Sequence, residues 1–140
     1  MEIKNKILVV DDKSIDRYMI GGIFRDEYDI IEAAGGQEAI NIIAAEHDAL
    51  AIVLLDIIMP GINGFGVLDY MSEKNLLDSL PVVITTDDSS EETSIEAFKR
   101  GGTDMVFKPF EPCIIKKRVQ NIIELYTYKK KYGVLYHEEA

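Results

Sequence analysis

An unbroken run of apolar residues at positions 49–55 constrains the fold of this chain more than any other feature. The run is far shorter than the ~20 residues that a membrane-spanning helix needs. Because it is apolar at every position, it is typical of a strand buried on both faces, as in a parallel sheet. Asp56 follows directly, and Pro60 and Gly61 then mark a tight turn. The pattern predicts that a central strand presents Asp56 at its carboxyl end, where open α/β sheets bind ligands.

Short strand-like runs and longer amphipathic segments alternate along the chain. The other strand-like runs are rich in β-branched or large apolar residues and lie at positions 7–10, 30–31, 82–84 and 105–107. After each run, apolar residues recur at the spacing of a helix face. This alternation predicts five βα units, in which a parallel five-stranded sheet is covered by helices on both faces as a three-layer α/β sandwich.

Two of the expected helices carry predictions about their first residues and their buried faces. Ser14 is expected to cap the first helix, and Ser89 with Glu92 matches a capping box for the fourth. The expected buried positions are Ile15, Met19, Ile20, Ile23 and Phe24 in the first helix, and Ile95 and Phe98 in the fourth. Both stripes should face the sheet.

The composition favours one globular domain and opposes two classes of partner. The chain has 140 residues, of which 47% are hydrophobic, and this is enough for one sizeable core. Its net charge of −10 opposes general binding to nucleic acid or to anionic membranes. Because Cys113 is the single cysteine, we expect neither an internal disulfide nor a cysteine-based metal site. The first residues do not have the pattern of a signal peptide, and we expect a cytoplasmic protein.

Polar side chains gather where four of the expected strands end. Asp11 and Asp12 follow the first strand, Asp56 the third, Thr86 the fourth and Lys108 the fifth. The carboxyl ends of parallel strands share one edge of the sheet, so these groups are expected to lie together. Three converging carboxylates either rise in pKa or are neutralised by a cation, and oxygen ligands favour a hard ion such as Mg²⁺. A nearby hydroxyl and ammonium suit a phosphoryl group, and Asp56 is then a candidate nucleophile that forms an aspartyl phosphate.

These motifs together resemble the response-regulator receiver domain of two-component signalling. The resemblance rests on Val-Asp-Asp at 10–12, Asp-Ile-Ile-Met-Pro at 56–60 with Gly64, Thr86, and Lys-Pro-Phe at 108–110. A lone Asp-Asp pair is a weak signal, but the motifs are jointly specific. The resemblance implies a flavodoxin-like (βα)5 fold with strand order 2-1-3-4-5.

The resemblance covers roughly residues 6–126 and implies a role for each motif residue. Asp56 would be the phosphoacceptor for a histidine kinase. The implied ligands of Mg²⁺ are Asp11, Asp12, Asp56 and the backbone carbonyl of Ile58, and the implied phosphoryl-binding groups are Thr86 and Lys108. A cis peptide bond before Pro109 is implied as well. We expect a receiver domain at 1–126, followed by a helix extension or linker at 127–140, where Tyr and Lys are interleaved.

Two positions depart from the family pattern. The residue after the switch threonine is usually very small, because it borders the route to the aspartate, and here it is Asp87. We expect this carboxylate to slow the approach of anionic donors to Asp56. The position three before the lysine is usually aromatic and swings inward when the threonine moves, but here it is Met105. An aromatic switch cannot operate there.

The resemblance implies a signalling switch and not an enzyme. The implied partners are a sensor histidine kinase or phosphotransfer protein, a downstream effector protein or domain, and a second copy in a phosphorylation-dependent homodimer. A receiver-like interaction module that is not phosphorylated stays open as the alternative. A flavodoxin or other cofactor-binding protein is disfavoured because Asp11 and Asp12 would repel a cofactor phosphate. A phosphatase with an aspartyl nucleophile would want a second acid where Ile58 stands.

Overall fold

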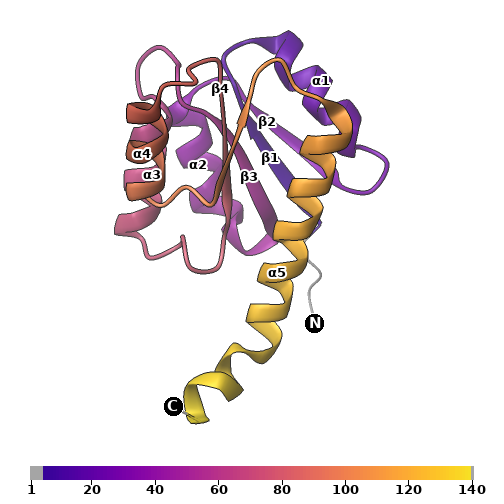
Figure 1. Ribbon diagram of the computed structural model, residues 1–140, viewed down its shortest axis with the longest axis vertical. Coiled ribbons are helices and arrows are strands. Elements are labelled where there is room, and N and C mark those ends of the chain that lie inside the picture. The colour runs from indigo at the N-terminus through magenta and orange to yellow at the C-terminus, as the bar shows by residue number, and fades with distance from the viewer. Residues whose placement is uncertain (1–4, 140) are drawn as a thin grey trace.

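Five parallel strands form the centre of the protein (Figure 1). The computed structural model describes the backbone of residues 5–139 and the side chains of residues 5–132, so residues 1–4 and 140 of the expected segments lie outside the described residues. The strands are β1 (Lys6–Val10), β2 (Asp29–Ala33), β3 (Leu50–Asp56), β4 (Val82–Thr86) and β5 (Asp104–Phe107). They pair in the order β2-β1-β3-β4-β5. The predicted flavodoxin-like fold and its strand order are therefore confirmed.

Five helices cover the sheet in two layers (Figure 1). They are α1 (Ser14–Phe24), α2 (Gly36–Glu46), α3 (Gly64–Glu73), α4 (Glu91–Lys99) and α5 (Pro112–Glu139), and a short 3-10 helix (His47–Ala49) precedes β3. Helices α1 and α5 pack on one face, and α2, α3 and α4 pack on the other.

Strand β3 is buried at every position, as the apolar run predicts. Its side chains alternate between the two cores: Ile52 and Leu54 pack with α1 and α5, whereas Val53 and Leu55 pack with the helices of the opposite face. Because β1 and β4 flank this strand on either side, its carboxyl end lies in the middle of the sheet edge. This position places Asp56 between the ends of two neighbouring strands.

The first residues of two helices differ from the sequence prediction. Ser14 does not cap α1, because the Asp11 carboxylate accepts a hydrogen bond from the backbone N–H of Lys13 at 2.9 Å and Lys13 takes the N-cap position. The cap of α4 is Ser90, one residue later than predicted, and its side chain accepts from the N–H of Thr93 at 3.3 Å. The cause is Asp88, which accepts from the Ser90 N–H at 2.9 Å and so extends the preceding loop by one residue.

The predicted buried faces of α1 and α4 are also partly wrong. In α1, Ile20 and Phe24 are buried as expected, but Ile15 and Met19 are 62% and 51% exposed. These two residues precede the buried stripe by one position, or about 100° of rotation around the helix.

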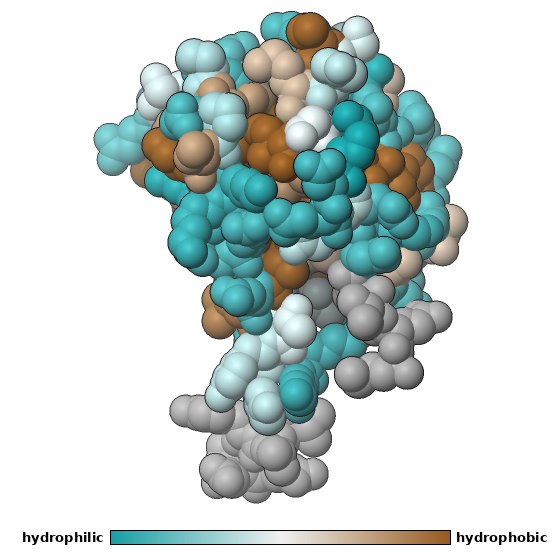
Figure 2. Space-filling model, turned by 90° about the vertical axis from the view of Figure 1, so that its right-hand side faces the viewer, coloured by the Kyte–Doolittle hydropathy of each residue, from teal (hydrophilic) through white to brown (hydrophobic). Residues whose placement is uncertain are grey.

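In α4, the buried residue is Ala97, whereas Ile95 and Phe98 on either side of it are each 49% exposed. The helix therefore meets the sheet through a small side chain, and its larger apolar side chains stay at the surface. Figure 2, which views the side of α1 and α5, likewise shows hydrophobic residues at the surface as separate patches among hydrophilic ones.

Helix α5 extends well past the sheet (Figure 1). Its first half is buried through Ile115 and Val119, while Leu125 and Tyr128 further along are more than half exposed. No helix in the part of the chain that the structure describes has the length and apolar character to cross a membrane.

The close approach of α3 to the end of β3 requires a glycine. A Cβ added at Gly64 would lie 2.6 Å from the backbone oxygen of Asp56 and 2.7 Å from the Cα of Ile57. The Gly64 N–H also donates to the carbonyl of Ile57 at 3.0 Å. Gly64 thus closes the loop that carries Asp56, and no larger residue fits without moving backbone.

We predict that Gly64→Ala lowers the free energy of unfolding by ~1–3 kcal/mol, because the added methyl group meets fixed backbone atoms. Gly22→Ala is the matched control, since a Cβ at Gly22 in α1 has nothing within 4 Å. The control should be neutral or stabilising by up to ~1 kcal/mol, as expected for alanine in a helix. Urea denaturation of both variants measures the difference, and equal stabilities would contradict this account of the loop.

Candidate functional site

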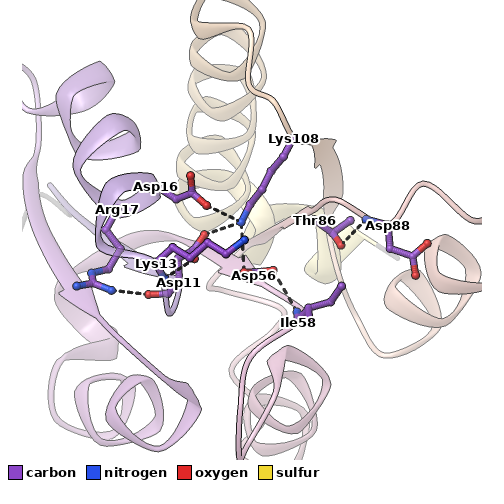
Figure 3. A network of polar contacts seen from close by, with 9 residues as sticks. All are labelled: Asp11, Lys13, Asp16, Arg17, Asp56, Ile58, Thr86, Asp88 and Lys108. Carbon is purple, nitrogen blue, oxygen red and sulfur yellow. Dashed lines mark hydrogen bonds and ion pairs between the residues drawn. The ribbon is translucent and has the colours of Figure 1, made fainter.

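The polar residues at the carboxyl ends of four strands meet at one edge of the sheet (Figure 3). Asp11 follows β1, Asp56 is the last residue of β3, Thr86 is the last residue of β4 and Lys108 follows β5. They come together because parallel pairing brings the ends of these strands to one side. The sequence prediction of a shared edge is correct in this respect.

Three carboxylates form a compact acidic cluster at this edge. One oxygen from each of Asp11, Asp12 and Asp56 lies within 4.8 Å of the other two. Asp11 and Asp56 are buried, with 0% and 3% exposure, whereas Asp12 is exposed. Hard cations such as Mg²⁺ prefer carboxylate oxygens, and one ion can satisfy several of them. The cluster could therefore hold a metal ion.

A shallow pocket of about 370 Å³ opens the cluster to solvent. It is lined by Asp12, Lys13, Asp56, Ile58, Met59, Pro60 and Asp87. Asp56 is the buried acid that borders this pocket, so a small molecule could reach its carboxylate. The backbone N–H of Ile58 donates to Asp56 Oδ1 at 3.1 Å and fixes the orientation of that carboxylate.

Lys108 donates hydrogen bonds to three carboxylates at this edge. Its Nζ donates to Asp11 Oδ2 at 2.8 Å, to Asp16 Oδ2 at 3.0 Å and to Asp56 Oδ2 at 3.3 Å (Figure 3). Burial alone would lower the pKa of Lys108, but the hydrogen bonds to Asp11 and Asp16 and the charge of Asp56 outweigh it and raise this pKa. The ammonium group therefore stays charged. The peptide bond between Lys108 and Pro109 is cis, as expected.

Asp16 is part of this network although the sequence analysis did not select it. It lies in the first turn of α1, and its Oδ2 accepts a hydrogen bond from Lys108 at the sheet edge. Acidic residues are common in the first turn of a helix because their negative charge interacts favourably with the helix dipole. For that reason the sequence carried no specific signal for a contact with Lys108.

The pKa of Asp56 is raised from its ordinary value of 3.8 to about 6. Burial of the carboxylate is the main cause, and the negative charge of Asp11 adds to it. The N–H of Ile58 and the ammonium of Lys108 oppose the shift only in part. One cation among these acids is thus too few to offset the cost of ionising Asp56, which is the condition that favours an added metal ion.

Thr86, Asp87 and Met105 make no hydrogen bond to the acidic cluster among the described residues. Thr86 is fully buried, and its Oγ1 accepts from the N–H of Asp88 at 3.0 Å (Figure 3). Asp87 is exposed and lines the pocket. Met105 is 5% exposed and packs in the core on the side of α2, α3 and α4. Asp87 therefore borders the pocket, whereas the side chains of Thr86 and Met105 are buried.

A parallel sheet of order 2-1-3-4-5 with three convergent carboxylates at its carboxyl edge defines a flavodoxin-like α/β protein with an acidic site that could hold a cation. Within this class, the chain belongs to the family of response regulator receiver domains, whose model matches residues 7–120. The predicted family is therefore confirmed, and with it the assignment to two-component response regulators.

Curated relatives agree with this assignment. The chain is 34% identical over 121 residues to a probable transcriptional regulator, ycf27, of Porphyridium aerugineum. It is also 34% identical over 122 residues to the transcriptional regulatory protein ResD of Bacillus subtilis. Each match covers 86% of this chain but 48% of the relative. The chain thus spans about half the length of these curated relatives.

Solved structures show the same fold. The receiver domain of the Francisella response regulator 1452 superposes with a TM-score of 0.78 at 28% identity, covering 86% of this chain and 97% of that one. The BeF3-activated receiver domain of DrrB superposes with a TM-score of 0.77 at 25% identity, covering 87% of this chain and 99% of that one. Both comparisons place the similarity over nearly the whole of an isolated receiver domain.

The raised pKa of Asp56 predicts a pH-dependent stability in metal-free buffer. A carboxyl group whose pKa is higher in the folded state destabilises the fold once it ionises, so the cost appears between about pH 4 and 6 and persists above. At pH 7.5, Asp56→Asn should be more stable than the wild type by on the order of 2 kcal/mol, and at pH 4 the two should be nearly equal. Urea denaturation at several pH values between 4 and 7.5 measures the difference in free energy of unfolding. A difference that does not change with pH would contradict the claim that ionised Asp56 destabilises the fold.

The acidic cluster predicts that Mg²⁺ raises the melting temperature. An ion that binds only the folded state, at a concentration of 100 times its Kd, raises the free energy of unfolding by ~2.7 kcal/mol. This increase corresponds to a rise of several degrees in the melting temperature. Asp12→Ala should remove most of this response, because it deletes one of the three convergent carboxylates. Asp48→Ala, which changes an exposed acid in the 3-10 helix, is the control and should respond as the wild type does. An undiminished response in Asp12→Ala would argue against the cluster as the ion site.

Proposed function

We propose that this protein is a phosphorylation-controlled switch of a two-component system, which accepts a phosphoryl group on Asp56. The observation that carries the proposal is the position of Asp56, a buried carboxylate that borders the open pocket and receives a hydrogen bond from Lys108. A carboxylate in this position can act as a nucleophile toward phosphorus. The family of the chain supports the same reaction class.

In the proposed reaction, an Asp56 carboxylate oxygen forms a bond to phosphorus and the bond to the donor breaks. When the donor is a phosphohistidine that carries a proton on its other ring nitrogen, the broken bond is P–N, and the electron pair of that bond stays on the departing neutral imidazole. The Lys108 ammonium lies 3.3 Å from the Asp56 oxygen and is placed to offset charge on the phosphoryl oxygens.

The chemistry of the site fits Mg²⁺ as the proposed cofactor. Asp11, Asp12 and Asp56 would hold the ion, together with the backbone carbonyl of Ile58 as the family resemblance implies. When bound, the ion supplies positive charge that offsets repulsion among the acids and the incoming phosphoryl group.

Thr86 is the proposed switch residue. Its Oγ1 accepts a hydrogen bond from the backbone N–H of Asp88, so its hydroxyl proton stays available for a phosphoryl oxygen. Because Thr86 is buried and ends β4, a shift of its side chain toward the site would change the loop that leads to α4. Met105 is buried on the adjacent strand and has a flexible thioether, so we propose that it follows this movement and does not control it.

The proposed partners follow from the same assignment. A sensor histidine kinase or phosphotransfer protein would supply the phosphoryl group in the cytoplasm, and a downstream effector protein or domain would bind the altered surface. We propose a receiver domain at residues 1–126 and a helix extension or linker at residues 127–140. No direct contact with nucleic acid or membrane is proposed for a chain of net charge −10.

A phosphorylation-dependent homodimer is a further proposed partner state. In α5, Leu125, Tyr128 and Tyr132 are exposed at intervals of three and four residues, which is the spacing of a seam between paired helices. Glu124 and Lys129 flank this seam five residues apart, a separation at which opposite charges on two parallel helices can pair.

One experiment separates the proposed switch from the alternative of an unphosphorylated interaction module. The protein is incubated with Mg²⁺ and acetyl phosphate or phosphoramidate, and its intact mass is measured. We predict that the wild type gains the mass of one phosphoryl group, whereas Asp56→Asn does not, because the amide is not a nucleophile of this kind. An unmodified wild type would favour the interaction module, and a modified Asp56→Asn would move the acceptor to another residue.

The departures at Asp87 and Met105 keep this alternative open, and Asp87 is the more direct of the two because its carboxylate lines the pocket through which a donor must approach. A like charge near the path of an anionic donor slows its arrival and reaction. Asp87→Ala should therefore speed phosphorylation by small anionic donors by about three- to tenfold. Quenched time courses followed by intact mass measure the rate, and an unchanged rate would show that Asp87 does not restrict the site.

A further inference from the structure

Every N–H bond of the Lys108 ammonium is already used. A protonated amine has three donors, and the three acceptors are the carboxylates of Asp11, Asp16 and Asp56 at 2.8, 3.0 and 3.3 Å. The Lys108 side chain is 8% exposed, so little water is present to replace a lost partner. A phosphoryl oxygen that needs Lys108 must therefore compete with a carboxylate that already holds it.

Asp16 depends on Lys108 more than the other two acids do. Asp11 Oδ1 accepts from the N–H of Lys13, and Asp56 Oδ1 accepts from the N–H of Ile58. In the part of the chain that the structure describes, the Asp16 carboxylate has Lys108 as its sole hydrogen-bond donor and sole ion-pair partner. Its side chain is 20% exposed, and it stands outside the cluster of three acids. Loss of the ammonium would leave this carboxylate with water alone.

We propose that Asp16 is a positioning residue. Its hydrogen bond to the Lys108 ammonium competes with the phosphoryl group and so weakens the interaction between Lys108 and that group. The inference rests on the proposed role of Asp56 as phosphoacceptor. In the unmodified protein, Asp16 draws the ammonium toward α1 and occupies one of its three donors. After phosphorylation, Asp16 remains an anion that competes for Lys108, so it limits how fully the ammonium neutralises the new charge. The residue thus lowers the stability of the modified state.

The test measures the affinity for beryllofluoride, a phosphoryl mimic, in saturating Mg²⁺ by titration calorimetry, with the affinity for Mg²⁺ alone as a second readout. Asp16→Asn keeps the shape of the side chain and removes its charge. We expect it to tighten beryllofluoride binding by about three- to tenfold and to change Mg²⁺ binding less, since charge-assisted hydrogen bonds are the stronger ones. Asp16→Glu restores the charge and should return the affinity toward that of the wild type.

Two further variants separate an effect through Lys108 from a general effect of charge. Asp87→Asn removes one negative charge from the pocket, which Asp16 does not line, and Asp87 has no bond to Lys108, so any gain in beryllofluoride affinity that it gives should be the same size in a Lys108→Met background. In a Lys108→Met background, Asp16→Asn should lose its selective effect. Melting temperatures without ligand show whether each variant is folded.

The outcomes distinguish this inference from the proposed function. A weaker or unchanged beryllofluoride affinity in Asp16→Asn overturns the role of Asp16, and so does a gain of equal size in the Lys108→Met background. Neither result affects the proposed function as long as the wild type binds beryllofluoride and Asp56→Asn does not. A wild type that binds Mg²⁺ but no beryllofluoride overturns both proposals.

Discussion

The burial of β3 on both faces is the constraint on which the rest of the structure depends. A strand that is apolar at every position needs helices on both sides and neighbours along both edges, and these requirements produce the three-layer parallel sheet. Its one polar residue, Asp56, can then lie only where the strand leaves the core. The neighbouring strands end beside it and add Asp11 and Thr86, and β5 leads to Lys108. The site is thus a consequence of the packing of the sheet.

The same packing explains why the site is electrostatically costly. Burial places the Asp11 and Asp56 carboxylates near each other with little solvent, and one ammonium is shared among three acids. Burial, with the negative charge of Asp11 beside it, raises the pKa of Asp56 to about 6. An added cation, or a change in which carboxylates the Lys108 ammonium contacts, lowers the free-energy cost of ionising Asp56. The protein therefore holds unfavourable interactions at the place where a ligand can offset them, which is a common feature of functional sites.

The sheet and the gathering of the motif residues could be predicted from the sequence because they depend on period and order along the chain. Strand ends in a parallel sheet share an edge, so the positions of Asp56 and Lys108 in the chain were enough. The exposed faces of α1 and α4 could not be predicted, since a shift of one position along the helix decides whether Ile15 is buried. Asp16 was missed for a similar reason. Its contact with Lys108 depends on the rotation of α1 about its axis, which the tertiary packing decides.

The most direct test of this account is a crystal structure of the protein with Mg²⁺ and beryllofluoride. The account predicts a beryllium bonded to a carboxylate oxygen of Asp56, an ion bound by Asp11, Asp12 and Asp56, and the Lys108 ammonium in contact with a fluoride. A beryllofluoride adduct on another residue, or a Mg²⁺ ion bound away from the three acids, would contradict the claim that the carboxyl edge of the sheet is the phosphoryl-accepting site.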